Sequence, residues 1–246
     1  MKITVLASGS KGNSTLIEVG GKHILIDVGL PLGNLEKRLD REMPKIDILI
    51  ITHTHVDHIK GIKSLLKKQK PIIFTLENDL DEKIDDVSLI NHSKFYEEGD
   101  LFLQFFELSH DVPCMGVYLK FCDKDLVYMT DTGYVKEKIL NKYKNKTMYI
   151  IESNYDEEML MNGSYPFYLK QRIRSDKGHI SNDDTCRYLR TLIGDRTRYV
   201  CLAHLSEENN NPSLALGKVN DLVSELVYSL DGTLICSQDV KEEILL

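Results

Sequence analysis

The sequence predicts an α/β protein (α+β in some classifications), with two mixed β-sheets packed back to back and helices on their outer faces. Short apolar runs of strand length recur along the chain, and segments with helical spacing of apolar residues lie between them in both halves. Burying these runs on both faces requires two packed sheets. With 42% hydrophobic residues, no low-complexity linker and no internal repeat, we expect residues 1–246 to form one domain.

The first half of the chain is rich in predicted strands. Gly20-Gly21 separates two alternating runs and predicts a hairpin. Residues 57–68 carry apolar side chains at helical spacing. The predicted strands are residues 3–7, 15–19, 22–27, 46–51 and 71–76.

The second half repeats this style. Residues 182–193 form a predicted helix that Ser181 or Asn182 could cap, and residues 212–226 form another that begins with proline. The predicted strands are residues 101–108, 117–122, 125–130, 148–152, 198–203 and, last in the chain, 234–236.

Composition narrows the class of protein. No stretch reaches the ~20 apolar residues of a membrane helix, and the apolar run after Lys2 is too short for a secretory signal. We therefore expect a cytoplasmic protein without a membrane partner. The five cysteines form no C-x-x-C pair, which favours free thiols over a disulfide framework or a cysteine zinc site. Any metal must be held by histidines and carboxylates.

Charge is unevenly distributed. The net charge of −7 argues against a general nucleic-acid coat protein. Residues 168–198, however, contain eight basic and four acidic residues, a local charge of +4. This stretch is either a solvated helix face or a patch that faces phosphate groups.

The segment His53-Thr54-His55-Val56-Asp57-His58 follows directly on a predicted buried strand. Loops at the carboxyl ends of strands commonly carry the chemistry of α/β proteins. Burying four polar side chains beside the core costs free energy unless a cation binds them. Imidazole and carboxylate together suit zinc, manganese or iron. His53 and His55 project the same way in an extended segment and can hold one ion, whereas Asp57 and His58 suit a second.

More ligands must then come from distant positions. His110, Asp131 and His204 each follow a predicted strand. Any one alone reads as a surface histidine or a turn aspartate, but three at equivalent strand ends indicate a shared site. Asp131 could bridge two ions with its two oxygens.

These residues resemble the pattern of the metallo-β-lactamase superfamily. Three further segments are similar to the YycJ (WalJ) family, cytoplasmic bacterial proteins of the superfamily's phosphodiesterase and nuclease branch. The three segments are Ser8-Gly9-Ser10-Lys11-Gly12-Asn13-Ser14, Gly178-His179-Ile180-Ser181-Asn182 and Leu202-Ala203-His204-Leu205-Ser206.

The resemblance implies a four-layer αββα sandwich with two divalent metal ions, zinc first and manganese or iron next. It implies that Asp131 bridges the ions and that Asp27 orients the histidine loop from behind the ligands, as metal-binding histidines commonly require. His55 stands where the oxygen-reducing diiron relatives have glutamate, which argues against redox chemistry. The implied ligands are His53, His55 and His110 for one ion, and Asp57, His58 and His204 for the other.

The resulting hypothesis is a nuclease or phosphodiesterase, with exonuclease action on DNA or RNA in view. Two ions would lower the pKa of a bridging water, and the resulting hydroxide would attack phosphorus. Asp57 could accept the water's proton. His179, in a turn before a predicted helix, is the candidate partner of the leaving oxygen, and the alternative is a capping turn without a catalytic role.

Candidate phosphate ligands lie in the two glycine-containing turns. The first turn could offer N–H groups and hydroxyls to a phosphate, or be an ordinary tight turn. The candidates are Ser8, Ser10, Asn13 and Ser181.

Two other functions fit the same residues. The ion pair could attack the carbonyl of a thioester or lactone. Alternatively, the metal could stabilise a regulatory protein that cleaves nothing. The +4 stretch and the other motifs of the similar family favour the phosphodiester over the acyl substrate. The intact set of seven ligand residues argues against a protein that cleaves nothing.

Overall fold

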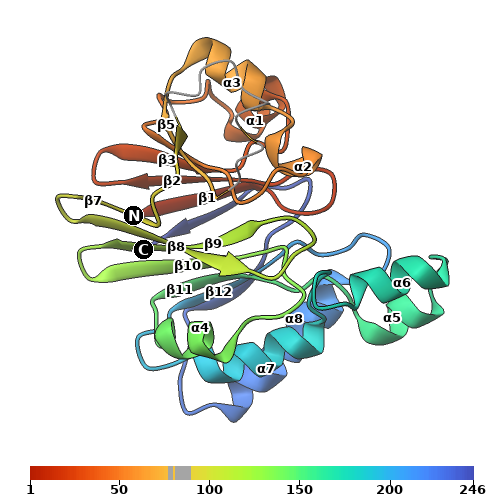
Figure 1. Ribbon diagram of the computed structural model, residues 1–246. Helices are drawn as coiled ribbons and strands as arrows, with labels where there is room; N and C mark the ends of the chain where they lie inside the picture. Colours follow the sequence, from red (N-terminus) through yellow and green to blue (C-terminus); the bar gives the residue numbers. More distant parts are fainter. Residues whose placement is uncertain (77–79, 81–89) are drawn as a thin grey trace.

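The computed structural model describes residues 1–76, 80 and 90–246, in which two β-sheets pack face to face (Figure 1). The first sheet has the strand order β14-β1-β2-β3-β4-β5-β6. Strands β3 to β6 run parallel, and the others pair antiparallel. Its strands are β1 (Lys2–Ala7), β2 (Ser14–Val19), β3 (Lys22–Ile26), β4 (Ile48–Ile50), β5 (Ile72–Phe74), β6 (Ile90–Asn91) and β14 (Glu242–Leu245).

The second sheet has the order β13-β12-β11-β10-β9-β8-β7. Strands β10 to β13 run parallel, and β7 to β10 pair antiparallel, so β8 also points the same way as β10. Its strands are β7 (Phe95–Glu98), β8 (Leu101–Leu108), β9 (Cys114–Phe121), β10 (Lys124–Met129), β11 (Met148–Glu152), β12 (Tyr199–Ala203) and β13 (Gly232–Ile235).

Helices cover the outer face of each sheet, which confirms the predicted four layers (Figure 1). On the first sheet lie α1 (Leu32–Leu39), α2 (Val56–Ile59) and α3 (Ile62–Lys68), and on the second lie α4 (Glu137–Lys142), α7 (Asn182–Leu192) and α8 (Pro212–Glu225). Two short helices, α5 (Glu157–Asn162) and α6 (Phe167–Ile173), project sideways from this sandwich. No helix of the described residues is long and apolar enough to span a membrane.

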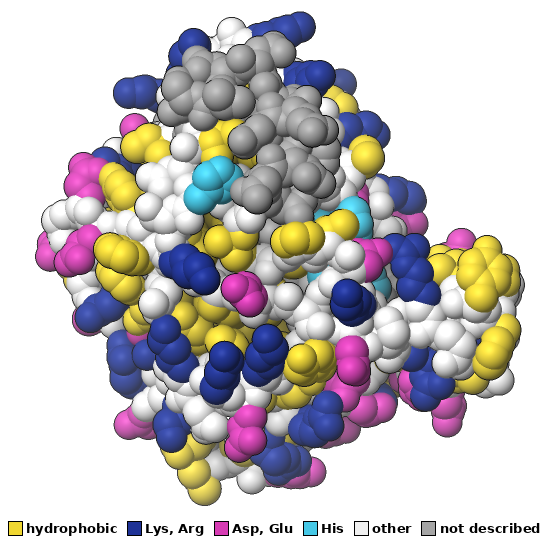
Figure 2. Space-filling view, in the orientation of Figure 1, with side chains coloured by type: hydrophobic (Ala, Val, Ile, Leu, Met, Phe, Trp, Pro, Cys, Tyr) yellow, Lys and Arg dark blue, Asp and Glu magenta, His cyan; other side chains and the backbone are white. Residues whose placement is uncertain are grey.

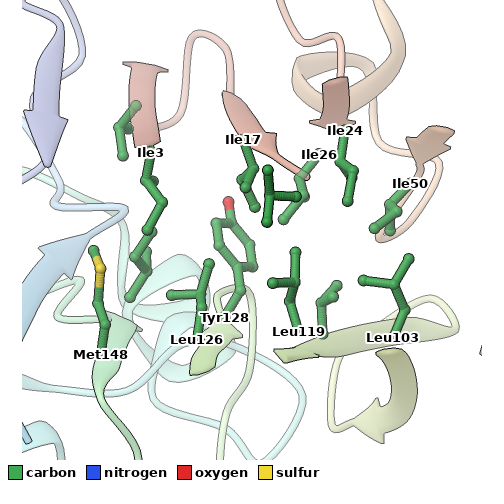
Figure 3. Close-up of a cluster of buried hydrophobic side chains, with 14 of the residues drawn as sticks. Ile3, Ile17, Ile24, Ile26, Ile50, Leu103, Leu119, Leu126, Tyr128 and Met148 are labelled. Atoms are coloured by element: carbon green, nitrogen blue, oxygen red, sulfur yellow. The ribbon is translucent and has the colours of Figure 1, made fainter. Parts of the chain in front are cut away.

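The central core lies between the two sheets. Figure 3 shows aliphatic side chains from the first sheet, among them Ile17 and Ile26, facing Leu119 and Leu126 of the second. All four are almost fully buried. Burial of one such side chain stabilises the fold by about 1.5–3 kcal/mol. This core fixes the two sheets against each other and thereby the loops at their edges.

The predicted elements mostly match the structure, with two corrections. The Gly20-Gly21 hairpin is confirmed, because both glycines have positive φ, 57° and 77°, as a two-residue turn of this kind requires. The single helix expected over 57–68 is wrong: it is broken into α2 and α3 at Gly61. The Gly61 N–H donates to the Val28 carbonyl, and an added Cβ would lie 2.1 Å from the Leu30 oxygen. The chain packs so closely here that a continuous helix is excluded.

The expectation that residues 234–236 form the last strand is also wrong. Strand β14 follows and pairs antiparallel with β1 at the edge of the first sheet. Short helices α1, α4, α5 and α6 were not predicted.

Candidate metal centre

The histidine loop begins just after β4, as the sequence predicts. His53 is fully buried, and α2 begins at Val56, so that His58 lies on the first turn of a helix. The imidazole centroid of His53 is 4.7 Å from that of His55 and 3.9 Å from that of His58. The loop therefore folds its ligand-type side chains onto one spot beside the core.

Three distant residues reach the same spot from the second sheet. His110 follows β8, Asp131 follows β10 and His204 follows β12. Because these three strands point the same way, their carboxyl ends meet at one edge of the sheet. The structure thus brings all seven residues that the sequence suggested as ligands into one region.

The ligand atoms form clusters that match the expected division between two ions. In each cluster the candidate ligand atoms lie within 4.8 Å of one another. The two clusters with the expected membership are His53, His55 and His110, and Asp57, His58 and His204. A third cluster, of His53, His58 and Asp131, shares a residue with each of these two, and a fourth contains Asp131, Glu152, His179 and His204.

Buried polar atoms test whether these residues suit a metal. Among the described residues, the Nε2 atoms of His53, His110 and His204 and Oδ2 of Asp131 are buried without a hydrogen-bond partner. Such groups are rare in folded proteins and call for an ion or water. Burial lowers the pKa of His53 well below its ordinary value, which keeps this imidazole neutral and able to coordinate. The donor set of imidazole and carboxylate therefore suits a divalent metal ion.

Asp27 lies behind the histidine loop, where the resemblance placed it. Its fully buried carboxylate accepts the backbone N–H and the hydroxyl of Thr52, both at 2.8 Å, and Nδ1–H of His58, also at 2.8 Å. This bond fixes the tautomer of His58, so that Nε2 faces the other ligands. Burial opposes protonation of His58, but the Asp27 and Asp131 carboxylates outweigh it and hold its pKa well above the ordinary value.

Three of the six described non-glycine residues with positive φ lie at this site. They are Asp27, Asp131 and His204, with φ angles of 59°, 59° and 55°. Non-glycine residues rarely adopt this left-handed conformation, and such strain tends to cluster at functional sites. Each of the three ends a strand by turning the backbone sharply toward the centre.

Glu152, which the sequence reading missed, serves the second sheet as Asp27 serves the first. It is the last residue of β11 and is fully buried. Oε1 accepts Nδ1–H of His204 at 2.9 Å and of His179 at 2.7 Å, and Oε2 accepts the Thr132 N–H at 3.0 Å. Its signal in the sequence was an acidic residue ending an apolar strand at the edge that carries Asp131 and His204.

The charges around Glu152 support one another. Burial alone would raise the pKa of Glu152, but His179 and His204 hold it well below the ordinary value. Burial would likewise lower the pKa of His204, yet Asp131 and Glu152 raise it to about 9. A carboxylate between two imidazoles is thus kept ionised and keeps both rings oriented.

His179 lies at the centre, beside these ligands. Its ring centroid is 5.1 Å from that of His204 and 5.4 Å from that of His110. About a fifth of its side chain is exposed, at 21%. With Nδ1 directed to Glu152, Nε2 is the ring nitrogen left for a substrate.

Asp111 is a second residue that the sequence reading missed. Its Oδ1 lies 3.3 Å from Nε2 of both His55 and His110, and its Oδ2 lies 2.5 Å from a guanidinium nitrogen of Arg172. It adjoins His110 in sequence, but nothing in the sequence indicated its partner in α6. Asp111, held by its ion pair with Arg172, therefore lies beside the cluster of His53, His55 and His110.

Two of the suggested phosphate ligands are occupied elsewhere. The Ser8 hydroxyl is buried and accepts the backbone N–H of His204 at 2.8 Å. The fully buried Asn13 amide donates to the Gly9 carbonyl and lies 3.2 Å from Oδ2 of Asp57. Their geometry is that of supports behind the ligands, because their polar atoms are already bonded within the protein.

The other two phosphate candidates differ in exposure. Ser181 caps α7: its hydroxyl accepts the N–H of Asp184 at 3.0 Å in a capping box, as the sequence suggested for this helix start. Ser10 is exposed in the first turn. Of the four candidates, Ser10 alone presents a solvent-accessible side chain.

Most arginines of the basic stretch, residues 168–198, are neutralised by acidic side chains, which a patch free to bind phosphate would not show. Five of its arginines form ion pairs with nearby acids, which favours the solvated-face reading for much of its length. Lys177 is exposed and forms no ion pair with a described residue. The pairs are Arg172–Asp111, Arg174–Glu157, Arg187–Asp184, Arg190–Glu225 and Arg196–Asp125.

A four-layer sandwich with clustered histidines and aspartates at one edge of both sheets defines a divalent-metal protein of the metallo-β-lactamase fold. The family described as Beta-lactamase superfamily domain matches residues 22–204. The chain belongs to this superfamily and, within it, to the family of the WalJ and YycJ proteins.

Two curated relatives carry the second assignment. Exodeoxyribonuclease WalJ of Streptococcus pneumoniae is 37% identical over 237 residues, covering 90% of this chain and 88% of the relative. Exodeoxyribonuclease YycJ of Bacillus anthracis is 32% identical, covering 92% and 90%. Among solved structures, the metallo-β-lactamase fold protein YhfI from Bacillus subtilis has a TM-score of 0.73 at 17% identity, covering 99% of each chain, and agrees in fold.

Proposed function

We propose that this chain is a metal-dependent nuclease, an exodeoxyribonuclease in the first instance, that works with two divalent ions. The observation that carries the proposal is the convergence, from both sheets, of buried imidazole and carboxylate atoms that have no hydrogen-bond partner among the described residues. The names of the WalJ and YycJ relatives supply the substrate class. Because ligands come from both sheets, we propose residues 1–246 as one hydrolase domain. The five free cysteines fit a reducing cytoplasm.

In this proposal each ion is held by residues of both sheets. His53, His55 and His110 would hold the first ion. Asp57, His58 and His204 would hold the second, and Asp131 would be a ligand shared by both. Zinc suits these ligands best, with manganese or iron as alternatives.

The ions supply Lewis acidity and make a water nucleophilic near neutral pH. Asp57 stays ionised around them: burial would raise its pKa, but the hydrogen bond and charge of His58 lower it to about 2. So low a pKa favours Asp57 as a ligand and hydrogen-bond acceptor over Asp57 as the base that was considered from the sequence.

His179 is the residue that donates a proton to the leaving oxygen. Glu152 accepts Nδ1–H of His179, and its negative charge favours the imidazolium form of the ring. That form carries a second proton on Nε2, which can pass to the leaving oxygen and leave a neutral imidazole. The neighbouring ligand His204 shares the same carboxylate oxygen. Glu152 therefore sets the relative position of a metal ligand and a proton donor.

The test is to purify the protein, measure bound metal, and assay bis-p-nitrophenyl phosphate, labelled DNA and labelled RNA. We expect diester cleavage that His58→Ala abolishes. His179→Ala should lower turnover with metal content unchanged. Hydrolysis of lactams or thioesters without any diester cleavage would reject the nuclease.

A further inference from the structure

The pair of helices α5 and α6 forms an arm, residues 157–173, that extends away from the sandwich (Figure 1). Large apolar side chains gather on this lobe (Figure 2), although it has little core of its own to bury them. Phe167 is 69% exposed, Tyr168 75% and Met161 38%. Aromatic side chains so fully exposed on neighbouring positions indicate a binding surface rather than packing.

The base of the arm is built into the metal centre. The Ile173 carbonyl at the end of α6 accepts the N–H of His179 at 2.9 Å. The carbonyl of Gly178, the residue before His179, accepts Nδ1–H of the ligand His110 at 3.3 Å. Arg172 of α6 pairs with Asp111 beside the same ligand. A molecule bound to the arm would therefore be held at a fixed distance from His179 and His110.

A pocket of about 130 Å³ joins the arm to the centre. Its walls come from one side of α6 and from the turn that carries His179. The lining residues are His110, Asp111, Leu169, Arg172, Ile173, Lys177, Gly178 and His179. Tyr168 lies four residues before the pocket residue Arg172, and side chains four residues apart are neighbours on a helix surface. The Tyr168 side chain therefore lies on the side of α6 that carries Arg172.

The charge of the arm's inner helix suits a polyanion. Helix α6 contains Lys170 and Arg172 and no acidic residue, and of the two only Arg172 is paired with a described acid, Asp111. Lys170 donates to the carbonyls of Met161 and Gly163, which ties the two helices of the arm together and keeps a positive charge there. Exposed Lys177 adds another at the base.

We propose that Phe167 and Tyr168 form a stacking platform for the bases of the nucleic-acid strand whose end occupies the metal centre. This rests on the proposed nuclease function. Aromatic platforms combined with basic residues are the usual means of binding single strands without sequence preference. Helix α6 spans about 9 Å at ~1.5 Å per residue. That length equals roughly three base steps of ~3.4 Å, so the platform contacts bases a few positions from the scissile bond.

A second copy of the chain is a weaker occupant for this surface. A fully buried aromatic side chain covers about 150–250 Å². Two of them fall well short of the roughly 800 Å² per partner that a stable interface buries. Stacked bases require no such extended contact.

The experiment measures binding of the metal-loaded protein to a fluorescein-labelled, cleavage-resistant phosphorothioate DNA strand by anisotropy. We expect Phe167→Ala and Tyr168→Ala each to raise Kd about tenfold, as loss of one base–aromatic stack does. Tyr168→Trp should retain wild-type affinity, because the larger ring still stacks. The matched control is Phe95→Ala, an aromatic residue 58% exposed on β7, away from the arm, whose Kd should stay unchanged.

An abasic strand of the same length separates stacking from charge. On it, the wild type and the two alanine variants should bind equally, because no base is left to stack. Unchanged Kd on the normal strand, an equal loss on the abasic strand, or a change of oligomeric state by light scattering would each overturn the platform. Binding that depends on the aromatics in a protein that cleaves no nucleic acid would refute the nuclease and leave the platform standing.

Discussion

The two halves of the metal centre are built in different ways. The first half-site (His53, His55, Asp57 and His58) is one continuous loop after β4. The second half-site (His110, Asp131 and His204) is assembled from three strand ends of the other sheet. Yet each has one buried carboxylate behind it, Asp27 in the first and Glu152 in the second. A local motif and a dispersed one thus converge on the same principle, an imidazole oriented by a carboxylate.

The largest effect is expected at the residue that joins the halves. Asp131 is 3.5 Å from Nε2 of His58 and 3.4 Å from Nε2 of His204, one from each half-site. Asp131→Ala should release at least one ion and lower diesterase activity by about 10³-fold, a loss typical of removing one preorganised electrostatic group. Metal analysis and steady-state kinetics measure both.

Asp176→Asn is the control for that substitution, because Asp176 is an exposed acid outside the clusters. Full metal content in Asp131→Ala would contradict the proposal that the two ions share Asp131 as a ligand.

The two supporting carboxylates give a sharper comparison. Asp27→Asn and Glu152→Gln should each weaken metal binding or activity by about 10–100-fold. Asp27 orients the ligand His58, so its loss should appear mainly in metal affinity. Glu152 also holds His179, so its loss should lower kcat even when metal is saturating. Competition with a chelator gives the affinities, and kinetics at saturating metal give kcat.

Equal kcat for the two variants at full metal loading would show that Glu152 acts on His204 alone. The role given to His179 would then fail, whereas the ligand assignments would remain.

The sequence predicted the first half-site better than the second for a physical reason. Ligands within one short segment are close in space in any fold, so the hexapeptide predicts a metal site without knowledge of the fold. His110, Asp131 and His204 could be identified only after the ends of the preceding strands were predicted. Those strands are apolar enough to be recognised in the sequence. Glu152 escaped because an acid at the end of an apolar run resembles a surface residue.

The same reasoning explains the other omissions. Asp27 was found only through the family resemblance, since an aspartate after a strand is ordinary in turns. The pairing of Asp111 with Arg172 spans 61 positions and depends on how α6 packs. Helices α4, α5 and α6 have six or seven residues, too few for helical periodicity to stand out.

A smaller effect is expected at Asp111, where the second sheet's loop reaches a ligand of the first half-site. Asp111→Asn keeps the shape of the side chain but removes the charge beside His55 and His110. We expect about tenfold weaker binding of one ion, the lower end of the effect of outer ligands. Chelator competition, with Asp176→Asn as the charge-matched control, measures it. If both variants bind metal alike, Asp111 serves only to anchor Arg172.

The smallest effect concerns Ser181, which the sequence offered both as a helix cap and as a phosphate ligand. Its hydroxyl accepts the Asp184 N–H at the start of α7, directly after the turn of His179. Ser181→Ala should therefore lower the free energy of unfolding by about 1 kcal/mol, the usual value of an N-cap, while KM for DNA stays unchanged. Urea unfolding of the metal-loaded protein measures the first, and kinetics the second. Exposed Ser10 provides the comparison, since Ser10→Ala should leave stability unchanged. A raised KM in Ser181→Ala without loss of stability would restore the phosphate-binding role, and would show that the second half-site extends into the substrate contacts.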